Sequence, residues 1–110
     1  MVRYLLDEFL ALFRKARLFW REVRTCAAAL VAVEHLLSQY EGARPTPQVR
    51  DALLRDLDSV LWSYYRQVYP GYAPNDLYWV EIDLRDEGID VHVWLRGFPG
   101  GRAREWLYRV

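Results

Sequence analysis

Residues 2–40 read VRYLLDEFLALFRKARLFWREVRTCAAALVAVEHLLSQY and contain neither glycine nor proline. Apolar residues recur through this stretch in alternating steps of three and four. The members of this apolar row are Val2, Leu5, Phe9, Leu12, Ala16, Phe19, Val23, Cys26, Leu30, Val33, Leu37 and Tyr40. This spacing is typical of a helix that packs along a heptad-like seam. The stretch therefore predicts one long N-terminal helix over about residues 2–40.

A second apolar row lies beside the first and widens the seam. Its members are Leu6, Phe13, Trp20 and Ala27. The resulting face suits packing against more than one helix. An unbroken helix of this length would measure roughly 60 Å, which is wider than a domain of this size. Either the helix bends or breaks, with Arg24-Thr25 as the softest point, or it projects and pairs with a second copy of itself.

A second helix is predicted over about residues 47–68. Gly42 ends the first helix, and Thr46 followed by Pro47 supplies a side-chain cap with proline at the first helical position. The apolar residues of this helix share one face, and charged residues occupy the rest. Because the link around Pro45 is short, the second helix should fold back antiparallel on the first.

The pattern changes to period two after a predicted loop from Tyr69 to Asp76. Alternation of apolar and polar residues predicts strands over about 77–84 and 89–96, joined as a β-hairpin. The tail at 104–110 suits a third strand or a last helical turn, and a strand is favoured because an isolated hairpin is marginal. The expected fold class is α+β, with a helical hairpin followed by an antiparallel β-hairpin or three-stranded meander.

Matching the apolar faces of the two strands predicts a register. The expected core pairs are Leu84 with Val91, Ile82 with Val93, and Val80 with Leu95. On the other face, the same register sets Asp83 opposite His92, Glu81 opposite Trp94, Arg85 opposite Asp90, and Trp79 opposite Arg96.

Composition and charge narrow the function classes. The chain has 110 residues, 53% of them hydrophobic, and its fifteen basic and fifteen acidic residues balance. This neutrality removes the global attraction that most nucleic-acid binders show, so any such binding would be local. Cys26 is the only cysteine, and no apolar run approaches a membrane span. We expect an intracellular, cytoplasmic protein without a membrane span.

Catalytic and metal signatures are weak. Asp83 and His92 form the nearest approach to an acid-base pair, but their strands offer no Ser, Thr or Cys as a nucleophile. Cys26 and His35 fall on opposite sides of a continuous helix. The two histidines lack the spacing of a zinc site. We expect no catalytic residue, no metal and no cofactor, and cross-strand charge pairing is the simpler role for Asp83 and His92.

Three surfaces remain as candidates for binding. Arg14, Arg17, Arg21 and Arg24 form a basic ridge on the first helix, suited to phosphates or an anionic membrane, with a solvated face as the plainer alternative. A run of aromatic residues crosses the loop after the second helix, and most of them are expected to pack inside the protein. Tyr69 and Tyr72 are the candidates for contact with a partner. The third surface is the seam, for which the candidate residues are Leu5, Phe9, Leu12, Phe19 and Val23.

The leading hypothesis is a non-enzymatic interaction or structural protein that self-associates through its first helix, with a dimer favoured. The seam is too long for the second helix alone to cover. The alternative is a nucleic-acid-binding accessory protein that uses the basic ridge. Docking of another protein also stays open, because acidic residues concentrate at 76–90 and arginines at 96–109.

Overall fold

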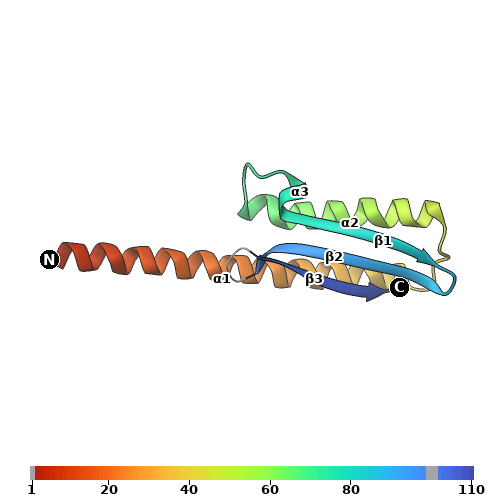
Figure 1. Ribbon diagram of the computed structural model, residues 1–110, viewed down its shortest axis with the longest axis horizontal. Helices are drawn as coiled ribbons and strands as arrows, with labels where there is room; N and C mark the ends of the chain where they lie inside the picture. The colour runs from red at the N-terminus through yellow and green to blue at the C-terminus, as the bar shows by residue number, and fades with distance from the viewer. Residues whose placement is uncertain (1, 99–101) are drawn as a thin grey trace.

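The protein is an elongated α+β molecule that measures 67 × 22 × 19 Å in the computed structural model (Figure 1). The structure describes residues 2–98 and 102–110, without the side chains of residues 2–9, 11, 13, 97, 98, 102 and 103. Two long helices are followed by a one-turn helix and a three-stranded antiparallel sheet of order β1-β2-β3. The predicted fold class is confirmed, and the C-terminal segment is the third strand of a meander.

Helix α1 is continuous from Val2–Gln39, so of the two alternatives the break at Arg24-Thr25 does not occur. At 1.5 Å per residue, its 38 residues span about 57 Å. Figure 1 shows its N-terminal half extending well beyond every other element. The long seam allowed either a bent or broken helix or a projecting one, and the structure has a projecting helix.

Helix α2 runs from Pro47–Val68, antiparallel to the C-terminal half of α1 (Figure 1). The hydroxyl of Thr46 accepts a hydrogen bond from the backbone N–H of Val49 at 3.2 Å, and Pro47 opens the first turn. Between the helices, Gly42 has φ +80°, a conformation that residues with a side chain rarely adopt. These local signals explain why the helical hairpin is readable from the sequence.

The loop predicted from Tyr69 to Asp76 contains a short helix that the sequence did not predict. Helix α3 comprises Pro74–Leu77, with proline in its first turn and a backbone bond from Asp76 N–H to Ala73 O of 3.0 Å. The side chain of Leu77 is buried and fastens the turn to the core. A single turn has no periodicity of its own, so only this tertiary contact reveals it.

The sheet consists of β1 (Tyr78–Arg85), β2 (Gly88–Phe98) and β3 (Arg102–Arg109). Val110 extends the pairing through two backbone bonds with Ile89, of 2.8 and 3.2 Å. A Cβ atom on Gly88 would lie 2.7 Å from the carbonyl oxygen of Val110. Glycine is therefore required where the hairpin turn passes the end of the chain.

The predicted register of the hairpin is wrong by two residues. Leu84 pairs with Ile89 instead of Val91, and Asp83 pairs with Asp90 instead of His92. Only Asp86 and Glu87 form the turn, whereas the prediction placed four residues there. A slip of two keeps every side chain on its own face, so matching hydrophobic faces cannot detect it.

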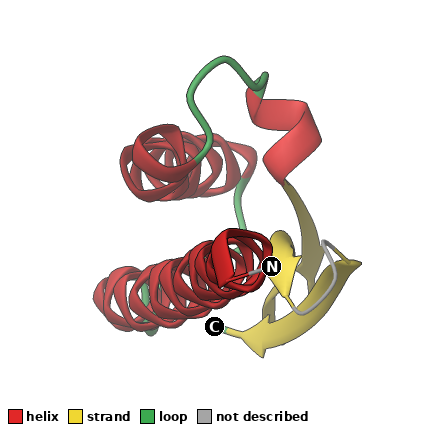
Figure 2. Cartoon of the chain, turned by 90° about the vertical axis from the view of Figure 1, so that its left-hand side faces the viewer, coloured by secondary structure: helices red, strands yellow, loops and turns green. Residues whose placement is uncertain are grey.

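Both long helices lie on one face of the sheet (Figure 2). The core between these layers contains apolar side chains from every long element. The most fully buried are Ala29 and Val33 of α1, Leu53, Leu57 and Leu61 of α2, and Ile89, Val91, Val93 and Leu95 of β2. All of the α1 members come from the C-terminal half of that helix.

Candidate functional site

The uncovered half of α1, residues 2–21, is the most distinctive surface of the molecule, and we call it the projecting segment. Every side chain described from Leu10 to Arg21 is exposed, and half-buried positions begin at Glu22. Near this boundary, the guanidinium of Arg21 donates a hydrogen bond of 3.3 Å to the backbone oxygen of Gln67. The body of the protein therefore covers α1 only from its middle onward.

One apolar row crosses this boundary. Leu12, Phe19, Cys26 and Val33 are spaced by seven, and their exposed fractions are 66%, 39%, 1% and 0%. Residues seven apart lie on nearly the same side of a helix. The row that forms the core therefore continues into solvent.

Further large apolar side chains of the projecting segment are exposed, and of these Trp20 adjoins the row. Leu10, Leu18 and Trp20 are 43%, 52% and 62% exposed. Phe19 and Trp20 meet edge to face, with ring centroids 5.9 Å apart. The exposed row and Trp20 form one apolar strip, whereas Leu10 and Leu18 lie on other sides of the helix, where single exposed apolar residues are ordinary.

The residues predicted for the seam divide between the two sides of the boundary. Leu12 and Phe19 are exposed, and Val23 is half-buried. Leu5 and Phe9 belong to α1, but their side chains lie outside the described residues.

The predicted basic ridge also lies on α1. Arg14, Arg17, Arg21 and Arg24 are all exposed. Within the described part of the chain, none of the four forms an ion pair; the described acid nearest in sequence, Glu22, accepts a hydrogen bond from Tyr69 instead. Burial and this bond raise the pKa of the Tyr69 hydroxyl above its usual range. The ridge therefore keeps most of its charge available to a partner.

The aromatic candidates are only partly exposed. Tyr72 is 48% exposed, but Tyr69 is half-buried and stacks on Tyr65 with ring planes 13° apart. Tyr72 meets Tyr69 edge to face at 5.7 Å, and the guanidinium of Arg96 lies 5.6 Å from the centre of the Tyr72 ring. This arrangement fastens the loop to the body, and only Tyr72 retains a large free surface.

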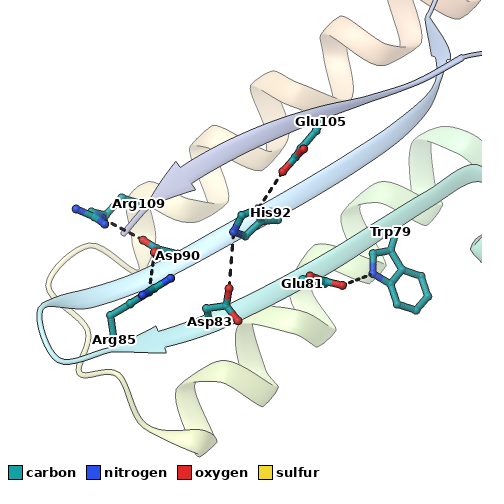
Figure 3. A network of polar contacts seen from close by, with 8 residues as sticks. All are labelled: Trp79, Glu81, Asp83, Arg85, Asp90, His92, Glu105 and Arg109. Carbon is teal, nitrogen blue, oxygen red and sulfur yellow. Dashed lines mark hydrogen bonds and ion pairs between the residues drawn. The ribbon is translucent and has the colours of Figure 1, made fainter.

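The outer face of the sheet carries a polar network centred on His92 (Figure 3). Its Nδ1 lies 3.1 Å from Oε1 of Glu105, and its Nε2 lies 3.7 Å from Oδ2 of Asp83. The ring stacks on Trp94 at 5.7 Å. His92 thus meets Asp83 diagonally instead of directly, and it gains a second carboxylate from β3 that the hairpin alone did not predict. The strands still bring no nucleophile to this histidine.

Asp90 is the most buried charged group on this face (Figure 3). Its two carboxylate oxygens accept hydrogen bonds from Arg85 at 3.1 Å and Arg109 at 3.0 Å. The bond from Arg109, together with the charges of both arginines, lowers the pKa of the Asp90 carboxyl. The predicted Arg85–Asp90 contact forms despite the shifted register, and it helps to join all three strands.

A groove between α2, α3 and the edge of β1 was not predicted. It has a volume of ≈ 420 Å³, and its walls include Leu54 of α2, Asn75 of α3 and Trp79 of β1. Its residues come from three separate elements, so no local sequence pattern could have identified it. Its lining contains neither His92 nor Cys26.

The remaining chemical candidates stay apart. Cys26 is buried, which raises the pKa of its thiol, whereas His35 is exposed. Among residues 2–98 and 102–110, as far as their side chains are described, no three His, Cys, Asp or Glu residues are placed to hold a metal ion. In the same part of the chain, no helix is both long and apolar enough to cross a membrane.

No family model, curated protein or solved structure matches this chain.

Proposed function

We propose that this is a non-enzymatic protein that self-associates, as a dimer, through the projecting segment of α1. The observation that carries this proposal is the apolar row whose members are buried at Cys26 and Val33 but exposed at Leu12 and Phe19. Exposed apolar surface in a heptad-like row is stabilised when a second helix covers it.

A second copy of the same helix is the occupant that fits best. The projecting segment offers about 20 residues, roughly 30 Å of helix. A second projecting segment has the same length and the same spacing of apolar residues, so each can cover the apolar row of the other. The resulting interface is isologous and closes as a dimer.

The continuity of α1 favours an antiparallel pair. Two straight helices that run parallel and touch along residues 2–21 would stay in contact beyond Val23, where α2 and the sheet already occupy the row. In an antiparallel pair, each segment ends where the partner's body begins. With Val2 of one copy beside Phe19 of the other, Leu5 lies opposite Ala16, and Phe9 lies opposite Leu12.

The two flanks of the row support the same orientation. On one side, positions spaced by seven are apolar: Leu6, Phe13 and Trp20. On the other side they are charged: Glu8, Lys15 and Glu22. Antiparallel helices bring like flanks together, so the apolar positions meet each other and Glu8 of each copy lies near Lys15 of the other. A parallel pair would set the apolar flank against the charged one.

Sedimentation equilibrium at micromolar concentration tests the proposal. The expected mass is twice the 13.1 kDa of one chain. Leu12→Asp should give a folded monomer, because it places a carboxylate in the row. Leu18→Asp is the matched control, since Leu18 is equally a leucine of the segment but lies about 120° around the helix from Leu12. A monomeric wild-type protein would refute the proposal.

A charge exchange tests the orientation. Lys15→Glu should weaken the dimer by roughly 0.5–1 kcal/mol per contact, and adding Glu8→Lys should restore it. Failure of the second change to rescue the first would contradict the antiparallel arrangement.

A further inference from the structure

We infer that the paired copies gather both basic ridges on one face, where they form a single surface that binds the phosphate backbone of a nucleic acid duplex. This inference rests on the proposed antiparallel dimer. It starts from the position of the ridge relative to the seam.

The ridge lies on one side of the apolar row. Arg17 and Arg24 are three residues before and four residues after Trp20, so they adjoin the apolar flank that carries Trp20. Arg14 and Arg21 continue the ridge toward the back of the helix. No ridge arginine falls on the flank that carries Lys15 and Glu22.

Symmetry decides where the second ridge lies. An antiparallel pair of identical helices is related by a two-fold axis perpendicular to both helix axes. Rotation about this axis reverses the direction of a helix but leaves a feature on the same face of the pair. Because like flanks meet, the two ridges adjoin the same apolar flank and share one face. A parallel pair would place them on opposite faces.

The combined surface has the size and charge that a nucleic acid backbone needs. Each copy contributes the four ridge arginines, and the one acid between residues 14 and 24, Glu22, lies on the other flank, although the whole chain is neutral. With the two-fold axis near residues 10 and 11, the outermost arginines of the two copies lie roughly 40 Å apart. This distance slightly exceeds one turn of a DNA duplex, about 34–36 Å. Guanidinium groups bind phosphate oxygens with two parallel hydrogen bonds.

A duplex is favoured over an anionic membrane. An amphipathic helix binds a membrane by inserting its apolar face. In the dimer, Leu12, Phe19 and the flank carrying Trp20 are covered by the second copy. Outside the interface the pair exposes the arginine surface, with Leu10 and Leu18 as separate apolar side chains, and the arginines suit contacts with phosphates in solution.

Fluorescence anisotropy with a labelled, mixed-sequence DNA duplex of about 20 base pairs, titrated at salt concentrations of roughly 50–200 mM, tests the inference. The expected result is binding that weakens steeply with salt. Arg17→Ala/Arg24→Ala removes two arginines per copy and should lower the slope of log affinity against log salt by up to about 3.6 per dimer. Arg55→Ala/Arg66→Ala is the matched control, because both arginines are exposed on α2 and lie outside the ridge; it should leave the slope unchanged.

The decisive variant is Leu12→Asp, which keeps every arginine but separates the copies. Its affinity should fall about tenfold or more, because each chain then offers half of the surface. A wild-type dimer without salt-sensitive binding would overturn this inference and leave the proposed self-association intact. Tighter binding to phosphatidylserine vesicles than to the duplex, or equal duplex affinity for Leu12→Asp, would also overturn it.

Discussion

The two halves of α1 have the same design but different surroundings. In the C-terminal half, the seam is covered by α2 and the sheet, and Cys26 and Val33 are almost fully buried. In the N-terminal half, the same row reaches solvent at Leu12 and Phe19. One uninterrupted helix joins them.

This difference shows that an apolar row predicts a surface suited to burial, but it does not identify the element that buries it. Helix α2 has 22 residues against the 38 of α1, so it cannot protect the whole seam. The sheet lies beside α2 along the same half of α1 (Figure 1). The uncovered half is therefore the part of α1 for which a partner is proposed.

The largest expected effect comes from placing the same charge in each half of the row. Val33→Asp should destabilise the protein by about 4 kcal/mol or more, since it buries an unpaired carboxylate in the core. Leu12→Asp should destabilise the protein far less, because Leu12 is exposed in the single chain and only the stabilisation by self-association is lost. Thermal unfolding followed by circular dichroism measures both, and similar losses in the two variants would contradict the division of α1 into covered and uncovered halves.

A second contrast uses thiol reactivity within the row. Cys26 is buried and its thiol pKa is raised, so we expect it to react with a maleimide only after unfolding. In a Leu12→Cys variant, the new thiol should react rapidly in dilute solution, where dimers dissociate. Mass spectrometry after timed quenching compares the two sites. Fast labelling of Cys26 in the native wild-type protein would show that the covered half opens.

A smaller effect concerns a hydrogen bond that holds α2 against the sheet. The buried hydroxyl of Tyr65 donates a hydrogen bond of 3.0 Å to the backbone oxygen of Arg96, which joins α2 to β2. Tyr65→Phe should cost roughly 1–2 kcal/mol of unfolding free energy. Tyr64→Phe, at the half-buried neighbouring position, is the control and should cost less in the same chemical denaturation experiment.

The smallest expected effect is a pH-dependent one in the sheet. Arg109 and Arg85 lower the pKa of Asp90 in the folded protein, so this carboxylate stabilises the fold above the usual aspartate pKa of about 4. That contribution is lost as the pH falls through the lowered pKa. Asp90→Asn should therefore be less stable than wild type at pH 7, and the difference should shrink toward pH 2. A constant difference in melting temperature across this range would contradict the role assigned to Asp90.

Much of the fold was readable from the sequence because its signals are local. Helical spacing predicted α1, and Thr46 with Pro47 predicted the start of α2. The register of the hairpin was missed because a slip of two leaves the apolar faces matched. Helix α3 was missed because one turn has no period, and its position depends on the burial of Leu77.

The candidate sites were readable to a different degree. The row and the ridge follow from spacing along one helix. Which half of the row is exposed depends on how much of α1 is covered by α2 and the sheet. No local sequence pattern gives the extent of this tertiary packing. The contact between His92 and Glu105 joins β2 to β3, so it could not follow from the hairpin pattern alone.

Disulfide trapping between two positions of the projecting segment tests the central claim most directly. A Leu5→Cys chain and an Ala16→Cys chain, one of them tagged to change its mass, are mixed and oxidised mildly; the native Cys26 is buried and should not compete. An antiparallel dimer predicts that the mixed chains cross-link to each other and that each chain alone cross-links poorly. Efficient cross-linking of Leu5→Cys chains to themselves, or no cross-linking in the mixture, would contradict the account.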